Sequence, residues 1–317
     1  MQTLRIVFGQ WRGILPIWCA IFGLTACQDR PGDRKLFVPE FDAQRAYALL
    51  EKQVDFGPRV PGTPAHAQCL QFLEDSLKAY ADGVQRQSFD YTIHKTGETV
   101  RLTNLISSFG TATGPRILLA AHWDSRPWAD QDPDSANHNK PVPGANDGAS
   151  GVAVLLEIAR VLKQNPPPVG VDIVLFDGED LGSEGYPDTY AAGAQYFAQK
   201  KSVHYAPYLG ILLDMIGDRE LQIYREANSV RYAPAVVDLV WNYAARLGIS
   251  NFYNPVRHEV FDDHVPLLNV GIPCIDLIDF DYPYWHTVHD TPDKCSPESL
   301  EKVGRVVLAV IYNPPAS

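Results

Sequence analysis

The 317-residue sequence lacks an excess of basic residues, with 27 lysines and arginines against 38 aspartates and glutamates. The formal net charge of −11 is spread through the chain and is not gathered in a tail. Because nucleic-acid binding depends on grouped basic side chains that contact phosphates, this balance argues against a nucleic-acid partner. Internal repeats are also missing, and the length suits one large core with at most a small extra lobe.

Long apolar runs are missing as well. The apolar run at residues 14–26 is too short to span a bilayer, and it follows Arg5 and Arg12, which is the pattern of a signal peptide. The run ends in Leu24-Thr-Ala-Cys27, which resembles the lipobox of bacterial lipoproteins, where the cysteine is lipidated. The alternative is an ordinary secretion signal. We therefore predict a lipoprotein signal peptide at residues 1–27 and a linker at residues 28–40.

A lipid on Cys27 implies a protein of the bacterial cell envelope that faces the periplasm and touches the membrane only through this anchor. Gln28 follows the cysteine, which favours the outer membrane. Cysteine is otherwise scarce: Cys69, Cys274 and Cys295 are odd in number and widely spaced, so they do not form a disulfide framework. Cys274 lies in an apolar run that is typical of core. We expect a monomer.

Residues 41–317 are predicted to form one catalytic domain. Continuous apolar runs such as 116–121 are typical of strands that are buried on both faces. Strands alternate with helices, which predicts an α/β sandwich on a largely parallel sheet. The predicted helices are 41–54, 63–80, 148–164, 191–200, 233–247 and 296–312. The predicted strands are 84–94, 100–109, 116–121, 171–176, 209–213, 221–225 and 272–278.

Ionisable residues gather where the predicted strands end, which is where open α/β sheets bind ligands. Carboxylates that converge there repel one another unless a cation lies between them. Histidine and carboxylates without cysteine suit a catalytic zinc ion that keeps one position open. Each residue alone has an ordinary alternative, an edge residue or a helix cap, but the set predicts a zinc site. Its members are His122, Asp147, Asp180, Asp214 and His286.

Two close pairs suggest a division of roles. Asp124 lies two residues after His122, so on an extended backbone both side chains face the same side. Asp124 can then orient a neighbouring imidazole, although a simple turn is the alternative. Glu179 and Asp180 are adjacent and therefore point in different directions. One can bind a metal while the other acts as a general acid/base, the alternative being a turn with two exposed acids.

Five motifs then carry a family resemblance. In order along the chain they are HWDS, GANDGASG, FDGED, LLDMIGD and WHTVHDT. From about residue 56 to the last helix the sequence resembles the co-catalytic zinc aminopeptidases and their relatives, the glutaminyl-peptide cyclotransferases. The resemblance implies a single α/β/α globule with a central mixed sheet. It also implies an activity, and the two branches differ in it.

Three features resemble the bacterial cyclases more than the aminopeptidases. Trp285 directly precedes His286, Asp262-Asp-His264 resembles an Asp-Asp-His of the cyclases, and the long loop 122–147 contains RPWADQDPD. Two departures accompany them. Segment 182–186 lacks a tryptophan that animal cyclases have after the paired acids, and Ala121 stands where those enzymes have a disulfide-forming cysteine.

By this resemblance one zinc ion is held by Asp147, Asp180 and His286. Two ions are the alternative, as in the aminopeptidases, with His122 and Asp214 as further ligands or as hydrogen-bonding groups. Asp180 stands where the family usually has glutamate, so the shorter side chain requires its loop to approach the metal more closely.

The resemblance also implies how an N-terminal glutamine of a peptide or protein would become pyroglutamate with release of ammonia. Glu179 would be the acid/base, beside a hydrogen-bonded carboxylate pair of Asp214 and Asp262. Trp285 with Tyr282 would form an apolar wall that folds the substrate side chain and keeps water away. The alternatives are a di-zinc aminopeptidase that releases N-terminal amino acids, and an inactive relative that serves as a receptor or scaffold.

Overall fold

The computed structural model describes residues 35–110 and 113–314, together with residues 2, 3 and 9. The predicted signal peptide at residues 1–27 and the linker up to residue 34 lie outside the described residues, apart from those three, so both stay predictions. In the part that is described, no helix combines the length and the apolar character needed to cross a membrane.

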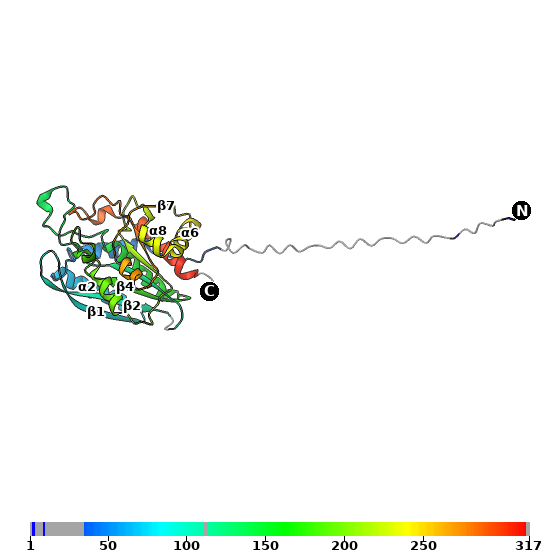
Figure 1. Ribbon diagram of the computed structural model, residues 1–317, viewed down its shortest axis with the longest axis horizontal. Coiled ribbons are helices and arrows are strands. Elements are labelled where there is room, and N and C mark those ends of the chain that lie inside the picture. The colour runs from blue at the N-terminus through cyan, green and yellow to red at the C-terminus, as the bar shows by residue number, and fades with distance from the viewer. Residues whose placement is uncertain (1, 4–8, 10–34, 111–112, 315–317) are drawn as a thin grey trace. The chain divides into compact units, whose positions relative to one another are not determined.

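A six-stranded sheet forms the centre of the fold, in the order β1-β2-β4-β3-β5-β8. Strands β4, β3, β5 and β8 run parallel to one another, whereas β2 is antiparallel to both β4 and the edge strand β1 (Figure 1). The predicted α/β fold with a mixed, largely parallel sheet is therefore confirmed. The strands are β1 (Gly83–Thr92), β2 (Thr99–Phe109), β3 (Arg116–His122), β4 (Gly170–Phe176), β5 (Leu209–Asp214) and β8 (Cys274–Ile278).

Helices cover both faces of this sheet. Successive residues of a strand point to opposite faces, so neighbouring side chains enter different cores. Leu119 faces one core, which contains side chains from α1, α2, α3, α6 and α8. Its neighbour Leu118 faces the other core, which contains side chains from α4 and α7. This double burial explains the continuous apolar runs. The helices are α1 (Ala43–Val54), α2 (Pro64–Lys78), α3 (Ala149–Gln164), α4 (Ala192–Lys200), α6 (Pro234–Arg246), α7 (His264–Asn269) and α8 (Pro297–Tyr312).

Smaller elements complete the fold. A two-stranded parallel sheet joins β6 (Ile223–Arg225) to β7 (Phe252–Val256), and the short helix α5 (Ala227–Tyr232) lies near β8. The 3₁₀ helices are η1 (Ser135–Asn137), η2 (Glu179–Leu181), η3 (Pro187–Thr189) and η4 (Pro292–Lys294). The three cysteines of the described part, Cys69, Cys274 and Cys295, are buried and unpaired, as the sequence predicts.

Candidate active site

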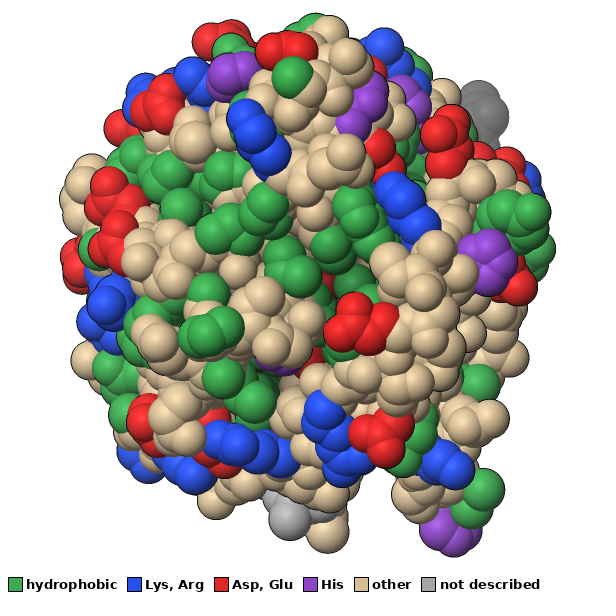
Figure 2. Space-filling model, turned by 90° about the vertical axis from the view of Figure 1, so that its left-hand side faces the viewer, with side chains coloured by type: hydrophobic (Ala, Val, Ile, Leu, Met, Phe, Trp, Pro, Cys, Tyr) green, Lys and Arg blue, Asp and Glu red, His purple; other side chains and the backbone are tan. Residues whose placement is uncertain are grey.

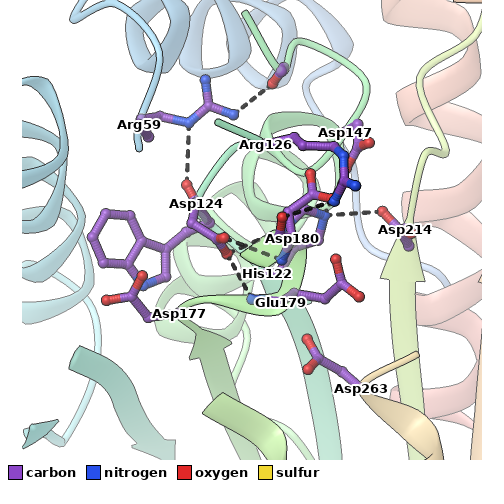
Figure 3. A network of polar contacts seen from close by, with 12 residues as sticks. Arg59, His122, Asp124, Arg126, Asp147, Asp177, Glu179, Asp180, Asp214 and Asp263 are labelled. Carbon is purple, nitrogen blue, oxygen red and sulfur yellow. Dashed lines mark hydrogen bonds and ion pairs between the residues drawn. The ribbon is translucent and has the colours of Figure 1, made fainter. Parts of the chain in front are cut away.

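The parallel strands bring the predicted residues to one end of the sheet. His122 ends β3 and Asp214 ends β5, while β4 leads into η2 and its Glu179 and Asp180. Asp147 lies two residues before α3. Figure 3 shows Asp147, Asp180 and Asp214 converging around His122. All of these side chains are buried, which makes the charge balance of the site decisive.

Asp147, Asp180 and His286 form a group that fits a metal ion. Their ligand atoms lie within 4.8 Å of one another. His286 Nε2 is 3.0 Å from Asp180 Oδ1 and 3.7 Å from Asp147 Oδ2. Asp147 Oδ2 and Asp180 Oδ2 are buried and accept no hydrogen bond, which is costly for a carboxylate unless a cation binds it. One imidazole and two carboxylates are a ligand set that zinc accepts with a position left open.

His122 lies between Asp147 and Asp214 in a second group of this kind. His122 Nε2 is 3.0 Å from Asp147 Oδ1 and 3.2 Å from Asp214 Oδ1. Burial opposes the charged imidazolium, but the surrounding carboxylates of Asp124, Asp147 and Asp214 outweigh it and raise the pKa of His122 well above its usual value. Either a second cation or a proton on His122 therefore balances these acids.

Asp124 fixes the segment that presents the two adjacent acids. Its Oδ1 and Oδ2 accept hydrogen bonds from the backbone N–H groups of Glu179 and Asp180, at 3.1 and 3.2 Å. Asp124 Oδ1 also lies 3.5 Å from His122 Nδ1, so it faces the imidazole at a longer distance than a hydrogen bond requires. The main role of Asp124 is thus to orient η2, and the sequence did not predict this role.

Glu179 and Asp180 have opposite protonation behaviour. Burial raises the pKa of Glu179 well above its usual value, and the negative charges of Asp180 and Asp262 raise it further. Burial also acts on Asp180, but His286 and Arg126 outweigh it and lower the pKa of Asp180. Adjacent acids with pKa values driven apart are suited to different tasks: Asp180 stays ionised as a ligand, and Glu179 can carry a proton.

The predicted hydrogen bond between Asp214 and Asp262 is not among those of the described residues. Asp214 instead contacts His122 at 3.2 Å, and the side-chain oxygens of Asp262 and Asp276 lie within 4.8 Å of each other. Burial and then Asp214 raise the pKa of Asp262 to about 6. Asp276 accepts no hydrogen bond from an N–H or O–H group. Asp262, which lines the pocket together with Glu179, is therefore grouped with Asp276.

This pair makes a prediction about stability. Burial and the nearby Asp262 raise the pKa of Asp276 well above its usual value, so the folded state binds this proton more tightly than the unfolded state. Stability is then lost as the pH rises above about 4. Asp276→Asn cannot ionise and its amide can donate to Asp262. Its free energy of unfolding should gain about 1–3 kcal/mol on wild type between pH 5 and pH 8. Urea unfolding with chelator present measures this difference, and parallel pH curves for the two proteins would contradict it.

A pocket opens directly beside these acids. Glu179, Asp180 and Asp214 line one part of it, and apolar side chains form a wall at another part: Val260, Phe261, Ile278, Phe280 and Trp285. The face shown in Figure 2 has a similar mixture, with apolar side chains gathered around acidic ones. The pocket can therefore hold a small substrate group against an apolar wall and present it to a general base.

Trp285 belongs to this wall and supports His286 as well. The indole stacks on the imidazole, with ring centroids 3.8 Å apart and planes at 26°. It also contacts Phe280 at 5.1 Å. The tryptophan thus covers one side of a candidate metal ligand and presents its remaining surface to the pocket.

Tyr282 corrects the sequence prediction, because it does not line the pocket. It is 3% exposed, and its hydroxyl donates to Asp290 Oδ1 at 2.7 Å. Asp290 in turn accepts the backbone N–H groups of Asn146 and Asp147. Tyr282 therefore helps to fix the backbone of the candidate ligand Asp147. Phe280 lines the pocket where Tyr282 was expected.

A family model described as peptidase family M28 matches residues 104–311. The chain belongs to peptidase family M28. The match contains every strand-end residue of the site as well as Asp262 and Trp285. Membership accounts for the shared motifs. It does not fix the activity, because the solved structures that resemble this chain are named for more than one activity.

Several of these structures are glutaminyl cyclases, and another is an aminopeptidase precursor. The Tannerella forsythia glutaminyl cyclase is 43% identical, with 87% of this chain and 99% of that chain covered and a TM-score of 0.83. The Bacteroides thetaiotaomicron glutaminyl cyclase, bound to N-acetylhistamine, is 40% identical over 87% and 99%, with a TM-score of 0.84. A leucine aminopeptidase precursor from the same species is 39% identical over 88% and 99%, with a TM-score of 0.85.

Sequence reasoning missed three contributors to this M28 site. Arg126 and Asp130 lie within RPWADQDPD, which was noticed only as part of a cyclase-like loop. Asp276 lies inside an apolar strand, where a carboxylate is unusual. That isolated acid was the available signal, because a buried charge in a strand implies a partner.

Proposed function

We propose that this protein is a zinc-dependent glutaminyl-peptide cyclotransferase that converts the N-terminal glutamine of peptides or proteins to pyroglutamate. The observation that carries the proposal is the apolar wall of Trp285, Phe280 and Phe261 beside Glu179 and the three candidate ligands. A hydrolase must admit and activate water at its base, whereas cyclisation requires water to be kept away from the reacting carbonyl.

Asp147, Asp180 and His286 would hold the zinc ion. When bound, such an ion supplies Lewis-acid polarisation of the γ-carbonyl of the glutamine. Glu179 takes a proton from the α-amine as its nitrogen attacks Cδ, the carbonyl carbon of the side-chain amide, and returns a proton to the departing ammonia. The C–N bond of the lactam forms and the C–N bond of the amide breaks, so atoms balance. The raised pKa of Glu179 suits this exchange near neutral pH.

The decisive experiment is mass spectrometry of a Gln-initiated peptide incubated with the purified protein, with and without chelator. Loss of ammonia from an otherwise intact peptide, blocked by chelator, is the expected result. Loss of the whole first residue would instead identify an aminopeptidase. An unchanged peptide in the presence of bound zinc would support a binding protein.

A di-zinc aminopeptidase is the second candidate, because His122, Asp147 and Asp214 form a further group with ligand spacing. The similarity to a leucine aminopeptidase precursor also favours it. The apolar wall of Trp285, Phe280 and Phe261 favours the cyclase instead, because a hydrolase has to admit water to its base.

Trp285→Ala tests the wall itself. Removing the indole opens the pocket to water and leaves the substrate side chain less restrained, so kcat/KM for Gln-initiated peptides should fall about 10- to 100-fold. Trp285→Phe keeps an aromatic face and should lose less than about 5-fold. Steady-state kinetics at saturating zinc measures both. Equal activity of the alanine variant and wild type would show that the indole does not contact the substrate.

We also propose that lipid on Cys27 anchors the enzyme in the cell envelope, facing the periplasm. The apolar run before Leu24-Thr-Ala-Cys27 supports this proposal. Labelling cells with a fatty-acid analogue should tag the protein, and Cys27→Ser should remove the tag. Unlabelled wild-type protein would refute the anchor.

A further inference from the structure

Arg126 is a buried cation that the proposed reaction does not use. It is 2% exposed, so its guanidinium group has left water and needs compensating partners. Its position in the chain directly follows Ser125 of the HWDS motif. Figure 3 shows Arg126 beside Asp180 and Asp147, on the side of the site where the candidate ligands gather.

One end of the guanidinium contacts Asp180. Arg126 Nη1 donates to the backbone carbonyl of Asp180 at 3.0 Å and lies 3.5 Å from its Oδ1. Asp180 is thus held through both its main chain and its side chain. Aspartate has a short side chain, so the position of its carboxylate depends strongly on the position of its backbone. The hydrogen bond from Arg126 to the Asp180 carbonyl fixes that backbone.

The other end of Arg126 binds Asp130 in a two-pronged ion pair. Nε and Nη2 donate to Oδ1 and Oδ2 of Asp130 at 2.8 and 2.7 Å. A guanidinium that donates from two nitrogens to the two oxygens of one carboxylate fixes the plane of that carboxylate, so the direction of Asp130 is set.

Asp130 faces His286 from the side away from Asp180. Its Oδ1 lies 3.6 Å from His286 Nδ1, while His286 Nε2 points at Asp180. At this distance the contact is electrostatic: the negative charge of Asp130 favours a proton on Nδ1 and leaves Nε2 free to bind a metal. The neighbouring backbone is tied in the same way, because Gln131 N–H donates to the His286 carbonyl at 3.2 Å.

We propose that Arg126 and Asp130 act as a positioning pair that holds Asp180 and His286 in ligating orientation. The inference rests on the proposed metal centre and not on the reaction that the centre performs. One guanidinium thereby controls two of the three candidate ligands, Asp180 directly and His286 through Asp130. Arg126 also donates to the carbonyl of Gly182 at 3.3 Å, which ties the start of the pocket-lining loop to the same group.

The expected effect is a loss of zinc affinity. Removing a group that orients metal ligands typically weakens binding about 10- to 100-fold. Arg126→Gln should show this full loss. Asp130→Asn keeps the shape but not the charge and should lose about 10-fold. Arg126→Lys keeps the charge but cannot donate to Asp130 and Asp180 in the same fork, so it should be intermediate.

The experiment is zinc titration of the metal-stripped full-length protein against a chromophoric chelator, which reads affinity without any enzyme assay. Arg116→Gln is the matched control. Arg116 makes a similar forked pair with Asp172, at 2.6 and 2.7 Å, at the opposite end of β3 from His122. This control should lower the melting temperature of the apo-protein while leaving the zinc Kd unchanged.

Unchanged zinc Kd values for Arg126→Gln and Asp130→Asn would overturn the proposal. An equal loss in Arg116→Gln would also overturn it, because the effect would then reflect general stability. If Arg126→Gln does not fold, Asp130→Asn and Arg126→Lys decide by the same measurement. Failure of wild type to bind zinc would refute the metal centre and this inference together, whereas zinc-loaded protein that leaves Gln-peptides unchanged would refute only the cyclase.

Discussion

Glu179→Gln is expected to lose cyclisation by about 100- to 10,000-fold while it keeps its zinc, because a positioned acid/base contributes about this much to proton transfer. Glutamine fills the same space but cannot take a proton from the substrate amine. Glu179 is 8% exposed and lies in the pocket, so the substitution acts where the substrate binds. Turnover of a Gln-initiated peptide and the zinc content per chain are the two measurements.

Glu184→Gln is the matched control for this variant. Glu184 lines the same pocket but is exposed at its rim, so its neutralisation should leave turnover within about 2-fold of wild type. A Glu179→Gln enzyme that turns over at more than about half the wild-type rate would show that another group moves the proton. If instead Glu179→Gln loses zinc, the glutamate is a ligand and the assignment of Asp180 is wrong.

Loss of a candidate metal ligand should lower turnover by a factor similar to that for Glu179→Gln. The zinc content of three variants then distinguishes one metal ion from two. Asp147→Asn and His286→Gln should retain little zinc and show less than about 1% of wild-type turnover, since both remove an atom of the proposed metal set. His122→Gln should keep about one zinc per chain, because His122 belongs to the other group of acids and can balance them with a proton.

Elemental analysis of dialysed protein gives the zinc count for each variant. A wild type with two zinc ions, which falls to one in His122→Gln, would contradict the single-metal prediction and favour the aminopeptidase. Melting temperatures of the metal-free variants serve as the control, because each of these side chains is buried and its replacement can weaken the fold.

Much of the fold was predictable from the sequence because its signals are local. Apolar runs such as 116–121 and 171–176 mark strands buried on both faces, and the helices have ordinary N-caps such as Thr63 and Ser296. The predicted helices and strands begin and end within about two residues of the bounds that the structure shows. Strand β8 starts at Cys274 instead of residue 272, directly after Pro273, which has no N–H to donate.

The elements that were missed carry weak signals. Helices α5 and α7 have six residues each, too few to show a periodic apolar face. Strand β7 contains Pro255 and is mostly exposed. Such segments take their structure from tertiary contacts: Ser229 of α5, for example, accepts the backbone N–H of Asp276 in β8.

The candidate ligands were predictable from the sequence, whereas the residues that support them were not. His122, Asp180 and Asp214 follow strands, and parallel strands bring their ends together whatever the loops do. Arg126, Asp130 and Asp290 act from loops, and their distances to the site depend on how those loops fold. Tyr282 shows that a loop sequence does not reveal which side chains reach the pocket. Phe280, two residues earlier, lines the pocket, whereas Tyr282 is buried and bonds Asp290.

The order of strands in the sheet has a consequence for biogenesis. Strand β8 is the last of the six-stranded sheet in sequence and lies at its edge, and the candidate ligand His286 comes after it in the chain. A nascent chain can form every earlier strand of this sheet and still lack His286. Catalytic competence therefore requires synthesis to pass residue 286, and we expect a chain that terminates earlier to be inert toward peptides however well its remaining part folds.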